Sequence, residues 1–266
     1  MTTGIISNDL ENALINHIFR NQEYASPGTS IYVGLFTDET EQDDDNSGTE
    51  VSGGNYARVQ VTSWDAPVSG STANTGSIDF PEASDSWGNV RYVGILDDSS
   101  SGSLLFWGQF SSDEEVGNGD VYSIDAGDLD IYIGGNVSFA LSASIINHVL
   151  RDTAMSVGGS KVYAALYFDD PTQSDVGTEV SGSAGYSRKN ITDWFPPVSG
   201  STGNSSTVEF DAATSDWGEV GYVGIRNTES GDPGDLYFGG ALDEPKTIGS
   251  GDIFRFSASA LHAVLD

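Results

Sequence analysis

The sequence predicts a mainly β protein made of tandem β-sandwich or jelly-roll-like domains, each opening with one short amphipathic helix. Two observations predict this fold class. Motifs of the first half of the chain return in the same order in the second half. Most of each half consists of short apolar runs separated by clusters of Gly, Ser, Asn and Asp, which are turn signals. Short strands at this spacing are typical of a sandwich or barrel rather than of a parallel α/β sheet.

The internal repeat covers nearly the whole chain. GTEVSGGNYAR (48–58) returns as GTEVSGSAGYSR (177–188), and SWGNVRYVGI (86–95) returns as DWGEVGYVGI (216–225). The spacing between matching segments stays nearly constant, which indicates that a whole domain has been duplicated.

The repeat divides the 266 residues into a predicted first domain over 1–136 and a second over 137–266. Each half is long enough to close its own core, so we expect each to fold independently. The short join between them suggests that the two domains touch. An apolar stretch around this join is expected to be buried by the interdomain contact or by a neighbouring chain; it comprises Ile131, Ile133, Val137 and Phe139.

A helix is predicted at the start of each domain. In the first, Ser7 or Asn8 is the expected N-cap, and the apolar stripe at helical spacing consists of Leu10, Leu14 and Ile18. In the second, Ser142 or Ser144 is the expected cap, and the stripe consists of Leu141, Ile145 and Val149.

Apolar runs after each helix are expected to form the strands. In the first domain they are 30–36, 58–64, 77–80, 90–96, 104–110 and 121–124, the last continuing through DLDIYIGG. In the second domain they are 161–168, 188–194, 207–210, 220–225, 236–240 and 253–259. The match of LFWG with LYFG pairs Trp107 with Phe238.

The chain is strongly acidic, with 40 Asp and Glu against 10 Lys and Arg, a net charge of -30 and a pI near 4.1. Such a surface repels itself in dilute buffer, whereas molar salt screens the repulsion. This composition favours adaptation to a salt-saturated cytoplasm or brine. The alternatives are an acidic protein from an ordinary organism or a calcium-loaded surface protein.

Composition also argues against several other classes of protein. Ten scattered cations form no basic patch, which disfavours nucleic-acid binding. No cysteine is present for a disulfide or a thiolate metal site, and no apolar stretch is long enough for a membrane span. The first residues, MTTGIISNDLENAL, lack the features of a secretory signal, so we expect a product that is made in the cytoplasm and used or assembled there.

Metal-binding and catalytic motifs are sparse. His17 and His148 occupy the same helix position in the two copies, and we expect a capping or helix-edge role for them. Asp43, Asp45 and Ser47, followed by Gly48, imitate the start of a calcium loop without its bidentate Glu. Loose association with Ca, Mg, K or Na is the expected behaviour, and no cofactor is required. No catalytic residue is assigned, because paired carboxylates among 40 acids are uninformative.

Tryptophans recur in both copies beside turns. Trp64 and Trp194 each precede PVSGST, and Trp87 and Trp217 each precede Gly. Exposed indoles would be sugar-binding platforms, whereas aromatic residues duplicated next to Gly or Pro more often close a core. The core interpretation is the favoured one for Trp64 and Trp194.

The order of helix, YVGLF, GTEVSGGNYAR, SWGNVRYVGI, LFWG and GNGD resembles the small virion structural proteins of tailed phages, of the tail-fibre, minor tail or head-decoration type. The resemblance covers nearly all of both copies. The departures from it are the duplication, the acidic loop at 38–48 and Asn55 before Tyr56.

With the acidic composition, the resemblance implies a tailed virus of a halophilic archaeon. It implies a non-enzymatic protein on the particle surface, either a head decoration or turret protein, towards which the lack of shaft repeats tilts the interpretation, or a tail-fibre or baseplate-associated protein. Expected partners are the major capsid or tail proteins and further copies of the chain, with no nucleic acid and no membrane. The alternative is a carbohydrate-binding adhesion module for host recognition.

Overall fold

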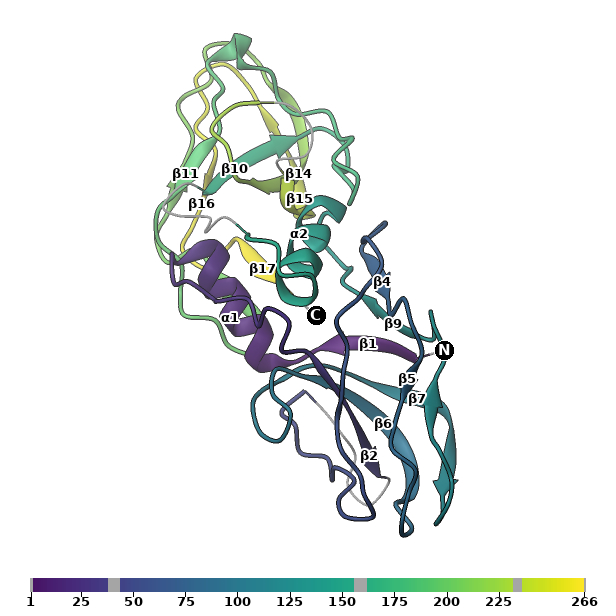
Figure 1. Cartoon of the computed structure of the whole chain (residues 1–266). Helices are drawn as coiled ribbons and strands as arrows, with labels where there is room; N and C mark the ends of the chain where they lie inside the picture. Colours follow the sequence, from purple (N-terminus) through teal and green to yellow (C-terminus); the bar gives the residue numbers. More distant parts are fainter. Residues whose placement is uncertain (1, 38–43, 156–161, 232–235, 266) are drawn as a thin grey trace.

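The computed structural model describes residues 2–37, 44–155, 162–231 and 236–265 and is mainly β, as predicted. Two β-rich lobes lie at opposite ends of the molecule, with two helices between them (Figure 1). Residues 1–136 are called repeat 1 and residues 137–266 repeat 2. No helix in the described ranges is long and apolar enough to cross a membrane.

Repeat 1 is organised around one seven-stranded sheet with the order β3-β2-β6-β7-β1-β9-β4, and β5 pairs with β8 separately. Its strands are β1 (Thr2–Ile6), β2 (Tyr32–Thr37), β3 (Val59–Gln60), β4 (Ser71–Ala73), β5 (Ile78–Asp79), β6 (Gly88–Leu96), β7 (Leu104–Val116), β8 (Ser123–Ile124) and β9 (Leu129–Tyr132). The last expected strand is therefore two strands, because the turn at Asp125–Asp128, with Gly127 at φ +83°, separates β8 from β9.

Repeat 2 repeats this plan in smaller sheets, with the orders β11-β10-β14-β15, β12-β17 and β13-β16. Its strands are β10 (Val162–Tyr167), β11 (Lys189–Ile191), β12 (Ser201–Gly203), β13 (Val208–Glu209), β14 (Gly218–Arg226), β15 (Leu236–Ile248), β16 (Arg255–Phe256) and β17 (His262–Val264). A short 3-10 helix covers Gly182–Ala184.

The strand registers correct one pairing expected from the sequence. Ile95 opposes Phe106 in repeat 1, and its counterpart Ile225 opposes Phe238 in repeat 2. Phe238 is therefore equivalent to Phe106, and Trp107 corresponds to Gly239. The error arose because matching LFWG with LYFG displaces the alignment by one residue.

Strand β1 was not predicted, since the sequence analysis placed a helix at the start of each repeat. In repeat 1, β1 precedes that helix and lies between β7, to which it is antiparallel, and β9, to which it is parallel. The five residues TTGII lack the alternation of apolar and polar side chains that marks a half-buried strand.

The helices are α1 (Asn8–Phe19) and α2 (Phe139–Leu150), and their predicted apolar stripes are buried. Ser7 caps α1, as expected, and its hydroxyl donates to the carbonyl of Leu104 in β7 at 2.6 Å. The cap of α2 is Ser138 instead of the expected Ser142 or Ser144, and its hydroxyl donates to the carbonyl of Leu236 at 2.5 Å. The Ser142 hydroxyl lies inside the helix, where it donates to the carbonyls of Ile133 and Ser138.

The apolar stretch at the join is covered within the chain. Ile131, Ile133 and Val137 are buried, whereas Phe139 is half-buried. The Ile133 N–H donates to the Gly70 carbonyl at 2.9 Å. Contacts within the chain therefore bury Ile131, Ile133 and Val137, and no neighbouring chain is needed to cover them.

Candidate functional site

The repeated motif that ends in Tyr and Arg builds the same partly buried ion pair in each repeat. In repeat 1, two guanidinium N–H groups of Arg58 donate to the two carboxylate oxygens of Glu50, both at 2.8 Å. Tyr56 donates its hydroxyl hydrogen to Glu50 and accepts from the Leu35 N–H in β2. Burial, followed by the nearby Glu50 charge, raises the pKa of Tyr56, so its hydroxyl stays protonated.

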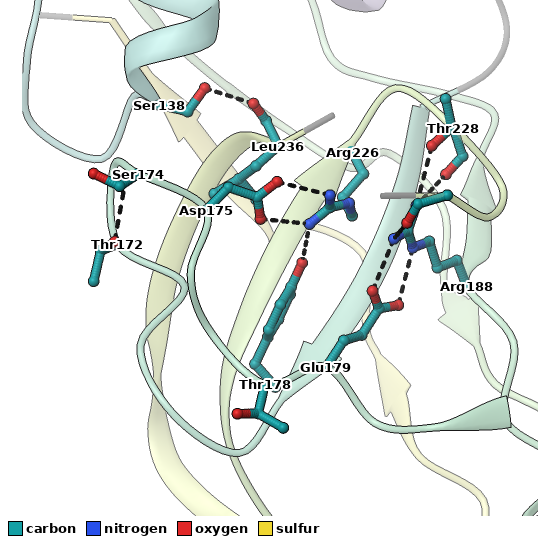
Figure 2. A network of polar contacts seen from close by, with 12 residues as sticks. Ser138, Thr172, Ser174, Asp175, Thr178, Glu179, Arg188, Arg226, Thr228 and Leu236 are labelled. Atoms are coloured by element: carbon teal, nitrogen blue, oxygen red, sulfur yellow. Dashed lines mark hydrogen bonds and ion pairs between the residues drawn. The ribbon is translucent and has the colours of Figure 1, made fainter. Parts of the chain in front are cut away.

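Repeat 2 reproduces this arrangement with Glu179, Tyr186 and Arg188, at 2.8 to 2.9 Å. Figure 2 shows the pair of Arg188 and Glu179. Arg188 also donates to the carbonyl of Thr228 at 3.0 Å, which joins the motif to the segment after β14. Bidentate pairs of this kind fix geometry as well as energy. Because the polar atoms of the motif bond to other residues of the same repeat, the motif has a structural role in both repeats.

A second charge cluster exists in repeat 2. Arg226 donates to the two oxygens of Asp175 at 2.7 and 2.8 Å and to the hydroxyl of Tyr167 (Figure 2). Burial raises the pKa of Tyr167 to about 12 even though Arg226 acts in the opposite direction. The strand registers place Leu96 and Phe36 at the positions of Arg226 and Tyr167, so this part of repeat 1 is apolar. The sequence analysis missed this cluster, although Arg226 at the end of a buried strand was a signal for it.

Each helix contacts both repeats, and the contacts are reciprocal. Phe19 at the end of α1 packs on Trp194 of repeat 2, with ring centroids 4.3 Å apart. The Gly200 N–H donates to the Asn12 side chain of α1 at 3.3 Å. In the other direction, Arg151 after α2 donates to the carbonyl of Trp64 in repeat 1 at 2.6 Å. The repeats are therefore joined as a pseudo-symmetric pair, in which equivalent surfaces face each other.

The two equivalent histidines meet at the centre of this junction, where their ring centroids are 5.4 Å apart. His17 accepts from the Tyr24 N–H at 3.0 Å, and His148 contacts the Tyr24 carbonyl through Nε2 at 2.9 Å. His17 and His148 accept from backbone N–H groups just past the ends of α1 and α2, those of Tyr24 and Met155, which agrees with the expected capping or helix-edge role. The sequence analysis did not foresee that the two rings meet, because it did not place α1 beside α2. Burial first, and the neighbouring His148 second, lower the pKa of His17; the Met155 backbone and Glu23 act weakly in the opposite direction.

This lowered pKa predicts acid sensitivity at the junction. The unfolded chain takes up a proton at His17 near pH 6.5, before the folded chain does, so the stabilisation from neutral His17 is present above that pH. It is lost as the pH falls through 6.5 towards the lower folded-state pKa. Thermal melts between pH 7.5 and 5.5 should therefore show a falling midpoint, and His17→Gln should reduce the fall. The exposed His262 provides the control, because His262→Gln should leave the profile unchanged.

Trp64 and Trp194 lie in the core with only 4% and 6% of their surface exposed, and Trp87 and Trp217 are buried as well. A sugar platform needs an exposed indole face, which neither Trp64 nor Trp194 presents. Trp194 instead belongs to the junction through its contact with Phe19.

The acidic segment is only partly described, and Asp43 lies outside the described residues. Asp45 and Ser47 are exposed, and Asp45 accepts from the Asn8 side chain at 3.0 Å. Asp44, which the sequence analysis did not single out, accepts from the Trp107 indole at 2.6 Å. Within the described ranges, no three His, Cys, Asp or Glu side chains are grouped so that they could hold a metal ion. Cation binding by this loop stays a prediction.

Comparison with known proteins gives the family of the chain. The family described as Podophage GP4 fiber I protein gp80 matches residues 5–132 and, a second time, residues 136–263. No curated protein matches the chain. The two matches cover nearly the whole sequence and coincide with the two sets of repeated motifs. The chain therefore belongs to the podophage fibre I protein gp80 family, as a tandem duplication of this virion structural protein.

Proposed function

We propose that the chain is a non-enzymatic fibre-type protein on the outside of a tailed virus particle, assembled in the host cytoplasm and attached to other tail proteins. The double match to a phage fibre family carries this proposal. The repeated Glu, Tyr and Arg residues support it, because they bond within the fold in both repeats. The family description favours a fibre over the head decoration or turret protein towards which the sequence analysis tilted.

Labelling of intact particles tests this function. An antibody against repeat 2, carried on gold, should bind the tails of purified virions, and mass spectrometry should find the chain in the same preparation. Gold confined to the heads would replace the fibre assignment with a decoration role. If the chain is absent from purified particles, the virion role is wrong.

Self-association is part of the proposal, in the form of a closed homo-oligomer attached to the particle. Closed symmetry is the usual state of soluble assemblies, and several weak contacts made together strengthen attachment. The apolar stretch at the join between the repeats does not support self-association, because it is covered within the chain. The carbohydrate-binding alternative lost its main support in the same way, since its two candidate indoles are buried.

We also propose a high-salt host, which the net charge of -30 motivates. Of the ten cations, Arg58, Arg188 and Arg226 are held in bidentate pairs, which leaves carboxylates in large excess over the remaining cations. The Debye length falls from about 10 Å at 0.1 M salt to about 3 Å at 1 M, so screening should remove much of their repulsion.

The thermal midpoint should therefore rise steadily between about 0.1 M and about 3 M KCl. A melt series followed by circular dichroism checks this. A flat profile would contradict the high-salt proposal while leaving the fibre proposal intact.

A further inference from the structure

Strand β1 shows how one edge of repeat 1 is completed. Its first residues, Thr2 to Gly4, pair in parallel with Leu129 to Ile131 in β9. Its last two residues, Ile5 and Ile6, pair antiparallel with Trp107 and Phe106 in β7. The N-terminal strand thus bridges β7 and β9, which would otherwise both present open edges.

Among the described residues, no such strand occupies the same position in repeat 2. The equivalence of β9 and β17 is set by matching bonds, because Asn74 accepts from the Leu129 N–H and Asn204 accepts from the Leu261 N–H. In the described part of the chain, β17 pairs with β12 alone, whereas β9 pairs with both β4 and β1. One edge of β17 is therefore open.

Connectivity explains the difference. The N-caps Ser7 and Ser138 are equivalent, so the counterpart of Thr2 is Ile133. The Ile133 N–H donates to Gly70 of repeat 1, and its carbonyl accepts from the Ser142 hydroxyl of α2. The segment that begins at Ile133, which would form the missing strand of repeat 2, instead serves as the connection between the two repeats. Pairing resumes only at Asn136 and Val137, next to Gly239 and Phe238.

Residues near this open edge are more exposed in repeat 2 than their counterparts in repeat 1, where β1 covers the sheet. Val93 is buried in repeat 1, whereas its counterpart Val223 is only half-buried. Gly108 is buried, whereas its counterpart Gly240 is half-buried. A groove of about 340 Å³ runs here between β15 and β17, and we call it the β17 groove. Its apolar lining includes Val223, Ile225, Phe238, Leu242, Phe256 and Leu261.

We propose that the β17 groove binds an extended segment of another virion protein, which adds as a strand parallel to β17 and completes repeat 2 as β1 completes repeat 1. This mode is β-strand addition, in which main-chain hydrogen bonds supply affinity. The donor comes from another protein because the β1 strand of this chain already fills its own repeat. The donor segment is neutral or basic, since an acidic segment would be repelled by a chain of net charge -30. That the donor is a virion protein rests on the proposed function, whereas the strand-binding groove does not.

The full chain tests this with a synthetic probe, the capped hexapeptide of residues 2–7 (TTGIIS), in molar KCl. The chain has no cysteine, so Ala241→Cys places a single polarity-sensitive dye on the exposed rim of the groove. The probe should give a saturable change in dye emission. The matched control is Gln109→Cys, the equivalent exposed position in repeat 1, where β1 is already in place and no change is expected.

Two further measurements separate strand addition from apolar adhesion. A probe with N-methylated amides cannot donate main-chain hydrogen bonds and should bind at least about tenfold more weakly. Gly240→Phe should fill the groove and abolish binding, because a Cβ at Gly240 meets nothing nearer than the Asn136 side chain at 3.9 Å. If that variant fails to fold, the methylated probe still distinguishes strand addition from apolar adhesion. The proposal is overturned by equal dye responses at the two positions, by equal binding of the methylated probe, or by no binding up to about 1 mM. None of these outcomes bears on where the protein lies in the particle.

Discussion

Replacing Trp194 by alanine is expected to lower the free energy of unfolding by about 3–5 kcal/mol. The indole is buried, and its contact with Phe19 joins repeat 2 to the helix of repeat 1, so the substitution leaves a cavity at the junction. Denaturant melts in molar KCl measure the change.

The adjacent Phe195 provides the control for this variant. It is 44% exposed, so Phe195→Ala should change the stability by no more than about 0.5 kcal/mol. A small effect of Trp194→Ala combined with lost binding to glycans would mean that the residue is a ligand platform, and the core assignment would fail.

Arg226→Met is expected to cost a similar amount, about 3–5 kcal/mol, because it removes the cation from a buried pair. Asp175 would lose the two bonds that it accepts from the guanidinium, and the Tyr167 hydroxyl would lose its donor. The exposed pair of Lys246 and Glu244 serves as the control, since Lys246→Met should cost less than about 1 kcal/mol.

Repeat 1 supplies a rescue for this variant. Its equivalent positions hold Leu96 and Phe36, which need no charge partner. The combination of Arg226→Leu, Tyr167→Phe and Asp175→Asn should therefore be more stable than Arg226→Met alone, since replacing a whole buried pair is often neutral. If the combined variant is as unstable as the single one, the loss does not come from an uncompensated charge.

The mainly β class and the duplication could be predicted because they depend on local patterns. Turn residues between apolar runs mark strands, and an internal repeat needs only the sequence itself. The helix stripes led by Leu10 and Leu141 were predicted for the same reason, since helical periodicity is a local property.

The features that were missed depend on long-range contacts. Strand β1 forms because β7 and β9 offer edges to it, and nothing in Thr2 to Ile6 alone announces this. His17 and His148 meet only because α1 and α2 pack together. The cap of α2 was misplaced because Ser138, Ser142 and Ser144 are equally good caps by composition. In the structure Ser138 has the extended backbone of a cap, and its hydroxyl accepts from the Leu141 N–H and donates to the distant Leu236 carbonyl.

The junction changes how the duplication is understood. Each repeat carries a full set of motifs, which predicted two independent folding units. In the structure, α1 contacts β12 of repeat 2 and α2 contacts β4 of repeat 1, so each repeat completes part of the core of the other. A single fibre-family domain would expose the surfaces that these contacts cover, and the tandem copy covers them within one chain.

The shared core of the two repeats implies that they unfold as one cooperative body, and this is the claim that calorimetry can test. Differential scanning calorimetry is carried out on the full chain in molar KCl, with Trp64→Ala in repeat 1 and Trp194→Ala in repeat 2 measured beside it. The structure predicts one transition, with equal calorimetric and van't Hoff enthalpies, that either substitution shifts as a whole. Two separate transitions, of which each substitution lowers only one, would show that the repeats are independent domains and would contradict the claim.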